Sequence, residues 1–464
     1  MHVAFIERID PQQRINKDQM GGYGIGFSVG TTARSRMIER HKRLRNVPVL
    51  TLGYVASFFH AAGHTIEVIS DGRISQQADL VLLYSSIVES AREVAYLKHV
   101  KQRSRAATGV IGPFAGHVPQ VYADVADCVV CGEPEALMQQ IAAGQPLPRG
   151  VVQSPVIQDM NTFPYPDWTP FPLETYSYYP LVLERPFVTV QASRGCDFLC
   201  SYCPYAAYYG KVRQRTVDNV LGELAHLVKT YGVRGIMFRD PLFTIHRPWV
   251  VQLMEGILQR GLTIRFGCET RMDLLDEELL DLMYRAGLRA VNCGVESVDK
   301  DVLKSADRNM SFHKLEQEVR HCEARGIKVA AFYVFGLMAD TEATIRRTLD
   351  YAKHLNTFVA QFHINTPFPG TKVYEEVKDT ITDHDWSHYD SFTPVFRHPQ
   401  LSNDQLIHLR QEAFTSYYFR LTYVLKHGGQ LLDSLAHSLV MSRDRRRQAV
   451  RAVDHPANRS SPAP

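Results

Sequence analysis

The chain has 464 residues, of which 45% are hydrophobic and 22% charged, as in an ordinary globular protein with room for about two or three domains. Its formal net charge of +3 is small for this length and gives no support for a nucleic-acid-binding protein. The eight cysteines lack the paired spacing of a disulfide framework, which favours a reducing compartment, and we expect the cytoplasm.

Two segments bear on targeting and membrane insertion. The apolar start over residues 1–6 stops at Glu7, so no cleavable signal sequence is recognisable. The long uncharged window over residues 46–66 contains Pro48, Gly53 and Gly63, and therefore predicts a helix followed by a turn. We expect no stable insertion into a membrane.

The first 147 residues alternate short apolar runs with helical patterns. The runs predict buried parallel strands, and the segments between them predict helices at residues 50–62, 90–105 and 134–143. The expected strands lie at residues 3–6, 65–69, 80–84, 108–112 and 128–131. This order predicts a Rossmann-like, doubly wound α/β sheet over residues 1–147, with ligands at the C-terminal strand ends.

A second alternation begins after a segment that is rich in proline and aromatic residues, residues 148–185, which predicts an extended linker. Over residues 186–375 six apolar runs with intervening helices predict a partial (β/α)6 barrel. Its strands are expected at residues 187–192, 235–238, 263–268, 290–294, 329–335 and 359–364. The helices between them are expected at residues 217–231, 248–260, 276–285, 312–325 and 342–355. A mainly helical C-terminal cap is expected over residues 376–440, with a helix over residues 402–423, and a disordered tail over residues 441–464.

Three cysteines follow the first expected barrel strand: Cys196, Cys200 and Cys203. Three thiolates on one short loop can hold three corners of a [4Fe-4S] cluster and leave its fourth iron open to a small molecule. The alternatives are a zinc knuckle or three unrelated buried thiols. Zinc needs a fourth nearby cysteine or histidine, and the nearest histidine downstream, His226, falls in a predicted helix.

The spacing of these cysteines, with the aromatic Tyr202 before the third, resembles the signature of the radical S-adenosylmethionine (SAM) superfamily. The polar residues at the expected strand ends resemble those of its cobalamin-type members. The resemblance implies a [4Fe-4S] cluster on the three cysteines and SAM as a cofactor. The residues that it implies for SAM are Tyr202, Asp240, Arg271, Glu296 and Asn365.

The order of segments before the barrel resembles the cobalamin-binding domain that precedes many radical SAM barrels. The resemblance implies cobalamin contacts from residues at the strand ends and from one helix, namely Tyr54, Ser85, Gly112, Gly132 and Glu133. The Asp-x-His-x-x-Gly motif that supplies an axial histidine to cobalt is absent. A domain that keeps the fold without the cofactor therefore stays open as an alternative.

The function that the resemblance implies is reductive cleavage of SAM to a 5′-deoxyadenosyl radical, which removes a hydrogen atom from an unactivated carbon. With cobalamin, the implied outcome is C-methylation of a small-molecule, lipid or natural-product intermediate, with electrons from a flavodoxin- or ferredoxin-type donor. One alternative is cyclisation, rearrangement or oxidation without methyl transfer. Another is a non-catalytic iron–sulfur or zinc protein.

Overall fold

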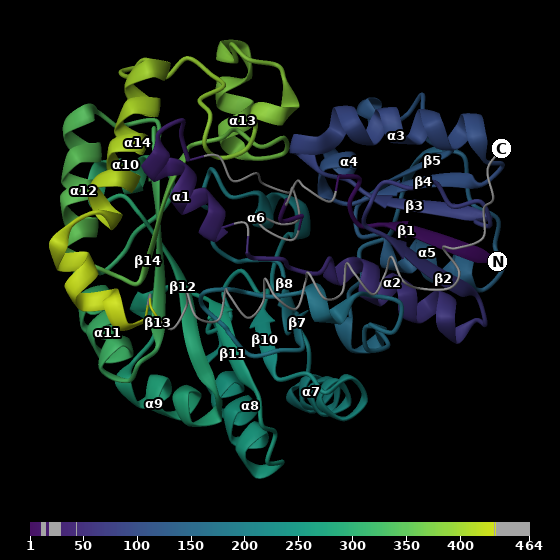
Figure 1. Cartoon of the computed structure of the whole chain (residues 1–464), viewed down its shortest axis with the longest axis horizontal. Coiled ribbons are helices and arrows are strands. Elements are labelled where there is room, and N and C mark those ends of the chain that lie inside the picture. The colour runs from purple at the N-terminus through teal and green to yellow at the C-terminus, as the bar shows by residue number, and fades with distance from the viewer. Residues whose placement is uncertain (11–14, 18–28, 43, 431, 433–464) are drawn as a thin grey trace, which may run out of the picture. The chain divides into compact units, whose positions relative to one another are not determined.

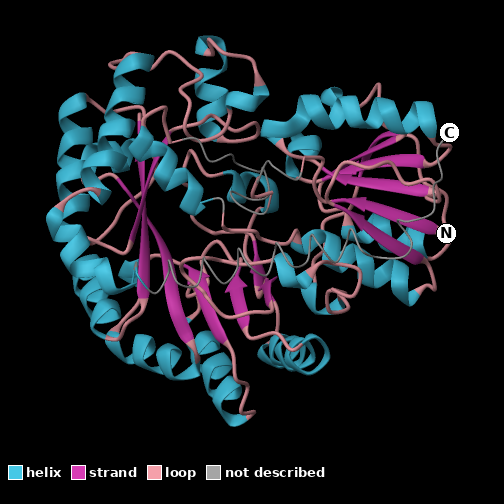
Figure 2. Cartoon of the chain, viewed as in Figure 1, coloured by secondary structure: helices cyan, strands magenta, loops and turns pink. Residues whose placement is uncertain are grey.

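The computed structural model describes residues 1–10, 15–17, 29–42, 44–430 and 432. Residues 1–415 form one compact unit, and residues from 416 onward form a second. The first unit contains two six-stranded sheets with helices packed around them (Figures 1 and 2). This arrangement confirms the α/β fold class.

The N-terminal sheet has the strand order β2-β1-β3-β4-β5-β6, and each neighbouring pair is parallel. Its strands are β1 (His2–Ile6), β2 (Thr65–Ile69), β3 (Leu80–Tyr84), β4 (Ala107–Ile111), β5 (Cys128–Cys131) and β6 (Gly150–Gln153). Helices α2 (Leu50–Ala61), α3 (Ser90–Arg103) and α5 (Glu135–Ala142) pack around it. The five strands predicted from apolar runs are all present, because a strand buried on both faces, such as β3, is apolar throughout.

The predicted linker was wrong in one respect, because its first residues form strand β6, parallel to β5. The prediction missed this strand because it is short, carries only two valines and lies at the sheet edge, where Val151 is 49% exposed. The rest of the segment packs closely: Trp168 is fully buried, and Phe171 stacks on Phe5 of β1 at a ring distance of 6.5 Å.

The second sheet has the order β14-β13-β12-β11-β10-β7 and is also parallel. Its strands are β7 (Phe187–Val190), β10 (Gly235–Phe238), β11 (Arg265–Glu269), β12 (Leu288–Glu296), β13 (Lys328–Phe335) and β14 (Val359–Ile364). Helices α7 (Val217–Tyr231), α8 (Arg247–Gln259), α9 (Glu277–Ala286), α11 (Phe312–Ala324) and α12 (Glu342–Leu355) cover its outer face (Figure 2). This is the predicted partial (β/α)6 barrel.

Local sequence signals explain why the barrel helices were predicted almost to the residue. The Thr216 hydroxyl accepts a hydrogen bond from the Asn219 amide at the start of α7, and Gly232 ends the helix in the left-handed conformation. At the start of α12, Thr341 and Thr344 form a reciprocal capping box.

Short helices were not predicted, because one or two turns leave too little periodicity to recognise. They are α4 (Pro113–His117), α6 (Pro204–Tyr209), α10 (Lys300–Ser305) and α13 (Lys372–Val377), together with the longer α1 (Ala33–Lys42). The helix expected over residues 402–423 is interrupted: α14 (Asn403–Tyr418) ends, and a helix resumes over residues 421–430. The predicted tail lies outside the described residues, and within the described ones no helix is long and apolar enough to cross a membrane.

A buried ion network joins the first sheet to the segment before the three cysteines. Arg194, on the short strand β8 (Ser193–Arg194), donates to Glu133 at 2.9 Å and to Glu135 at 2.8 Å. The three side chains are at most 3% exposed. Arg213, on the paired strand β9 (Arg213–Gln214), also binds Glu133, at 2.5 Å. Each charge therefore depends on its partners for compensation.

Replacing Arg194 by methionine tests this network. The substitution leaves two carboxylates buried without that cation, so we expect Arg194→Met to lower the free energy of unfolding by about 3–5 kcal/mol. The matched control is Arg247→Met, whose ion pair with Asp276 is 42% exposed on the arginine side and, screened by solvent, contributes less than about 1 kcal/mol. Denaturant titrations measure the free energy of unfolding of both variants. If both variants lose the same amount, the buried ion network does not contribute more to stability than an exposed ion pair.

Candidate active site

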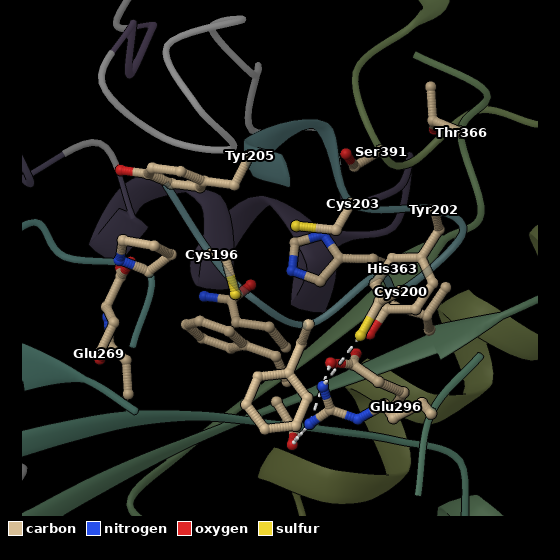
Figure 3. A pocket seen from close by; sticks show the side chains of 18 of the residues that line it. Cys196, Cys200, Tyr202, Cys203, Tyr205, Glu269, Glu296, His363, Thr366 and Ser391 are labelled. Carbon is tan, nitrogen blue, oxygen red and sulfur yellow. Dashed lines mark hydrogen bonds and ion pairs between the residues drawn. The ribbon is translucent and has the colours of Figure 1, made fainter. Parts of the chain in front are cut away.

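The cysteine loop, residues 196–203, connects β8 to α6 at the C-terminal end of the first barrel strand. Cys196, Cys200 and Cys203 all line one open cavity, called here the barrel pocket (Figure 3). Gly195 precedes the loop at φ 89°, and a Cβ there would lie 2.2 Å from the carbonyl oxygen of Lys211. Only glycine therefore allows β8 and β9 to close beneath the loop.

The loop is fixed by backbone hydrogen bonds to distant parts of the barrel. The amide of Ser201 donates to the carbonyl of Ala306 at 3.2 Å, and the amide of Val373 donates to the carbonyl of Ser201 at 3.1 Å. Tyr202 packs against the small apolar cluster of Val302 and Leu337. These contacts, from α10 and α13, position a loop that contains no regular structure of its own.

The donor set of the loop suits a cluster better than a single ion. Among the residues that the structure describes, no three Cys, His, Asp or Glu side chains converge closely enough to hold one metal ion. A cuboidal cluster instead takes each thiolate on a different iron, so its ligands need to face a common space without meeting at a point. Figure 3 shows the three labelled cysteines around such a space.

The protonation of the thiols also reflects their surroundings. Burial raises the pKa of Cys203 to about 12 and raises that of Cys196 above its usual value. Near Cys200, the guanidinium of Arg308 lies 3.9 Å from Sγ. The thiols of Cys196 and Cys203 are therefore protonated at neutral pH when free, and iron binding has to displace those protons.

Glu296 enters the pocket because strand β12 is irregular at its end. The register against β13 shifts between Gly294 and Glu296, and Glu296 adopts φ 65°. A Cβ on Gly294 would lie 2.1 Å from the Glu296 carboxylate, so the glycine makes room for it. Burial raises the pKa of Glu296, and the Arg308 guanidinium at 3.7 Å opposes that rise.

Two of the other residues predicted to contact SAM also line the pocket. Arg271 binds Asp273 at 2.8 Å and lies 4.7 Å from the ring of Phe198, while its Nη1 atom is buried without a hydrogen-bond partner. Asn365 donates through its side-chain amide to the carbonyl of Gly336 at 3.2 Å. Its side-chain oxygen is buried and accepts no hydrogen bond.

Asp240 differs from the other predicted SAM residues, since it is not among the described residues that line the pocket. It accepts hydrogen bonds from the Ser193 hydroxyl at 2.6 Å and from the Ala192 amide at 3.1 Å. Burial raises its pKa to about 6. In this arrangement the carboxyl group holds the chain between β7 and β8, ahead of the cysteine loop.

Sequence reasoning missed several charged residues of the pocket. Arg239 and Glu269 form an ion pair at 2.5 Å, at the ends of β10 and β11. Both were visible as polar residues at strand ends, which is the signal that could have identified them. Arg308 and Arg45 carry no such signal, because one lies in a loop after α10 and the other comes from the N-terminal third of the chain.

The residues predicted to contact cobalamin fall into two groups. Ser85, Gly112 and Gly132 follow β3, β4 and β5 at the C-terminal edge of the first sheet, where ligands of doubly wound sheets bind. Tyr54 is instead buried against Phe163 at a ring distance of 5.3 Å. Glu133 is held by the ion pairs described above, so its role toward cobalamin stays a prediction.

Comparison with known proteins agrees with this architecture. Residues 190–352 match the radical SAM superfamily. The chain is 27% identical over 275 residues to an uncharacterized methyltransferase of Pyrococcus horikoshii, covering 59% of each chain. It is 28% identical over 255 residues to the anaerobic magnesium-protoporphyrin IX monomethyl ester cyclase of Rubrivivax gelatinosus, covering 54% of this chain and 45% of the cyclase. The chain thus spans less than two thirds of the length of these relatives.

The fold resembles that of a solved enzyme over almost its whole length. The radical SAM methyltransferase TsrM from Kitasatospora setae superimposes with a TM-score of 0.62 at 16% identity, covering 89% of both chains. At this identity the likeness concerns the fold, which confirms the predicted order of a Rossmann-like domain and a radical SAM barrel. With the sequence match over residues 190–352 and the three cysteines facing the pocket, the barrel is a radical SAM domain.

Proposed function

We propose that the protein binds a [4Fe-4S] cluster on Cys196, Cys200 and Cys203 and cleaves SAM reductively to functionalise an unactivated carbon, most directly by C-methylation. The observation that carries this proposal is that the three thiols and four of the five residues predicted to contact SAM line one pocket. A cluster with one open iron and a zwitterionic ligand would then share a single cavity.

The chain's own residues would hold and shield the reacting groups. A reduced cluster held by the three cysteines would supply the one electron that cleaves SAM to methionine and a 5′-deoxyadenosyl radical, and this radical would take a hydrogen atom from the substrate. The pocket wall carries large apolar side chains, including Phe332, Val334 and Phe368, which exclude water from a radical. The protein contributes position and shielding, since the cofactors carry the difficult chemistry.

Unsatisfied polar atoms of the pocket fit SAM as a ligand. The side-chain oxygen of Asn365 has no hydrogen-bond donor, and the amino group of an adenine would supply one. Arg271 Nη1 lacks an acceptor, and the SAM carboxylate would supply it. Glu296 is the carboxylate placed to accept from the ammonium or the ribose.

Cobalamin is the second proposed cofactor. The support is the Rossmann-like domain, whose strand ends present Ser85, Gly112 and Gly132, and the likeness of the whole fold to a methyltransferase that was also solved with cobalamin bound. The methyltransferase relative favours methyl transfer as the outcome. Because another relative is a cyclase, ring closure without methyl transfer is the second candidate function.

The remaining components follow from the same chemistry. A small molecule, lipid or natural-product intermediate fits a cavity that is lined by residues of the four barrel strands β11, β12, β13 and β14. A flavodoxin- or ferredoxin-type protein would supply electrons, and Leu199, 74% exposed in the cysteine loop, marks a point where such a donor can approach. We propose the cytoplasm as the compartment, because it is reducing.

Removal of one cluster ligand tests the proposed chemistry. After anaerobic reconstitution with iron and sulfide, we expect the wild-type protein to form 5′-deoxyadenosine from SAM in the presence of dithionite. Cys200→Ala removes a thiolate and should abolish that product. Cys322→Ala, which changes a fully buried cysteine of α11 outside the pocket, is the matched control and should retain it. A wild-type protein that holds a full cluster and yet cleaves no SAM would contradict the proposal.

The products distinguish methyl transfer from the alternative. Protein purified anaerobically with hydroxocobalamin, and assayed with cell extract as the source of substrate, should form S-adenosylhomocysteine together with 5′-deoxyadenosine. One SAM molecule provides the methyl group and another provides the radical. Formation of 5′-deoxyadenosine alone, with cobalamin bound, would instead favour cyclisation, rearrangement or oxidation. Chromatographic quantification gives the ratio of S-adenosylhomocysteine to 5′-deoxyadenosine.

A further inference from the structure

Arg45 comes from the segment between α1 and α2, far from the barrel in sequence, yet it lines the barrel pocket. Its backbone is fixed on both sides. The amide of Asn46 donates to the carbonyl of Ser177 at 2.9 Å, and the amide of Ser177 donates back to Asn46 at 2.8 Å. The Ser177 hydroxyl donates to the carbonyl of Leu44 at 2.7 Å. The position of Arg45 is therefore built into the fold.

The side chain of Arg45 is held over an aromatic ring. The residue is 7% exposed, and its guanidinium carbon lies 4.5 Å from the ring centre of Tyr178. Tyr178 is itself fixed, because its ring stacks on Phe187 at 5.9 Å and its hydroxyl accepts a hydrogen bond from Asn292 at 2.6 Å. A ring face orients the cation but does not neutralise its charge.

The other arginines of the pocket each have a carboxylate. Arg239 pairs with Glu269 at 2.5 Å, Arg271 with Asp273 at 2.8 Å, and Arg308 with Glu296 at 3.7 Å. For Arg45, no carboxylate of the described chain lies within ion-pair distance, and its guanidinium donates no hydrogen bond to any described residue. SAM brings one carboxylate against an ammonium and a sulfonium, so it adds no net negative charge. The proposed cluster is negative with its three thiolates, but it offers a guanidinium only sulfur atoms, which are weak hydrogen-bond acceptors.

Because the Arg45 guanidinium faces the pocket and pairs with no carboxylate of the described residues, an anionic group of a ligand can bind to it there. The planar guanidinium matches a carboxylate or a phosphate group in shape and hydrogen bonding. On the basis of the proposed function, we infer that Arg45 binds a carboxylate or phosphate group of the substrate. The apolar pocket residues Phe332, Val334 and Phe392 then contact its hydrocarbon part.

Thermal stability separates a binding role of Arg45 from a structural one. Arg45→Met breaks no ion pair of the described residues and keeps most of the side-chain volume, so the substrate-free variant should melt at or above the wild-type temperature. The matched control is Arg215→Met, which breaks the ion pair of a 3% exposed arginine with Glu223 outside the pocket and should lower the melting temperature. An Arg45→Met protein that melts well below wild type, as Arg215→Met should, would overturn the inference.

Pairs of charged and neutral probes test the ligand chemistry in the same assay. Benzoate is compared with benzamide, and phenyl phosphate with phenol, on the cluster-loaded protein under anaerobic conditions. We expect the anionic member of at least one pair to raise the wild-type melting temperature more than its neutral partner, and this difference to disappear in Arg45→Met. Equal effects of the two members, no effect of either anion, or a difference that persists in the variant would overturn the inference.

Two cofactors also carry anionic groups, the carboxylate of SAM and the phosphate of cobalamin, and equilibrium dialysis distinguishes them from a substrate. Arg45→Met should keep its affinity for SAM and for hydroxocobalamin within about threefold of wild type. A loss of about tenfold or more for either would assign Arg45 to that cofactor and overturn the substrate assignment. None of these measurements requires turnover, so a failure of SAM cleavage and a failure of this inference give different results.

Discussion

The buried ion pairs of Arg194 with Glu133 and Glu135 connect the segment after β5 of the first sheet to the short strand β8, which leads into the cysteine loop. This placement matters because the loop has little structure of its own. It is held at one end by β8 and β9, and in its middle by hydrogen bonds to the ends of α10 and α13. The orientation of three thiols toward the pocket therefore depends on contacts that span most of the first unit.

The pocket that these contacts define combines an apolar wall with a closely balanced set of charges. Glu269, Asp273 and Glu296 each face an arginine, and the irregular end of β12 brings Glu296 into the cavity. Burying an ion pair costs less free energy than burying a single ion. A cavity lined by ion pairs can therefore exclude water from a radical intermediate. Arg45 is the exception among the described pocket arginines, because it pairs with no described carboxylate, and from this we infer an anionic group on the substrate.

Much of the fold followed from the sequence, because long apolar runs and capped helices are local signals. The barrel strand β14 and the helices α7 and α12 were predicted to the residue. Strand β6 and the short helices were missed, since their apolar content is small and their stability comes from packing against neighbours. The cysteines were recognisable by their spacing alone, and they do line the pocket.

The other site residues show the limits of local signals. Arg45 and Arg308 reach the pocket through long-range contacts that no spacing along the chain reveals. Asp240 and Glu133 were singled out by resemblance, yet the structure engages both with neighbouring protein groups: Ser193 for the first, and Arg194 and Arg213 for the second. The partners of a charged residue depend on the tertiary fold, which explains why resemblance identified the residues but not their contacts.

The central claim is that the three cysteines hold a cluster whose fourth iron is open to SAM. Mössbauer spectroscopy of protein reconstituted with ⁵⁷Fe, recorded with and without SAM, tests this claim most directly. The account predicts that adding SAM changes the spectral parameters of one iron site and leaves the other three unchanged. Four irons that do not respond to SAM, or iron bound in a mononuclear form, would contradict it.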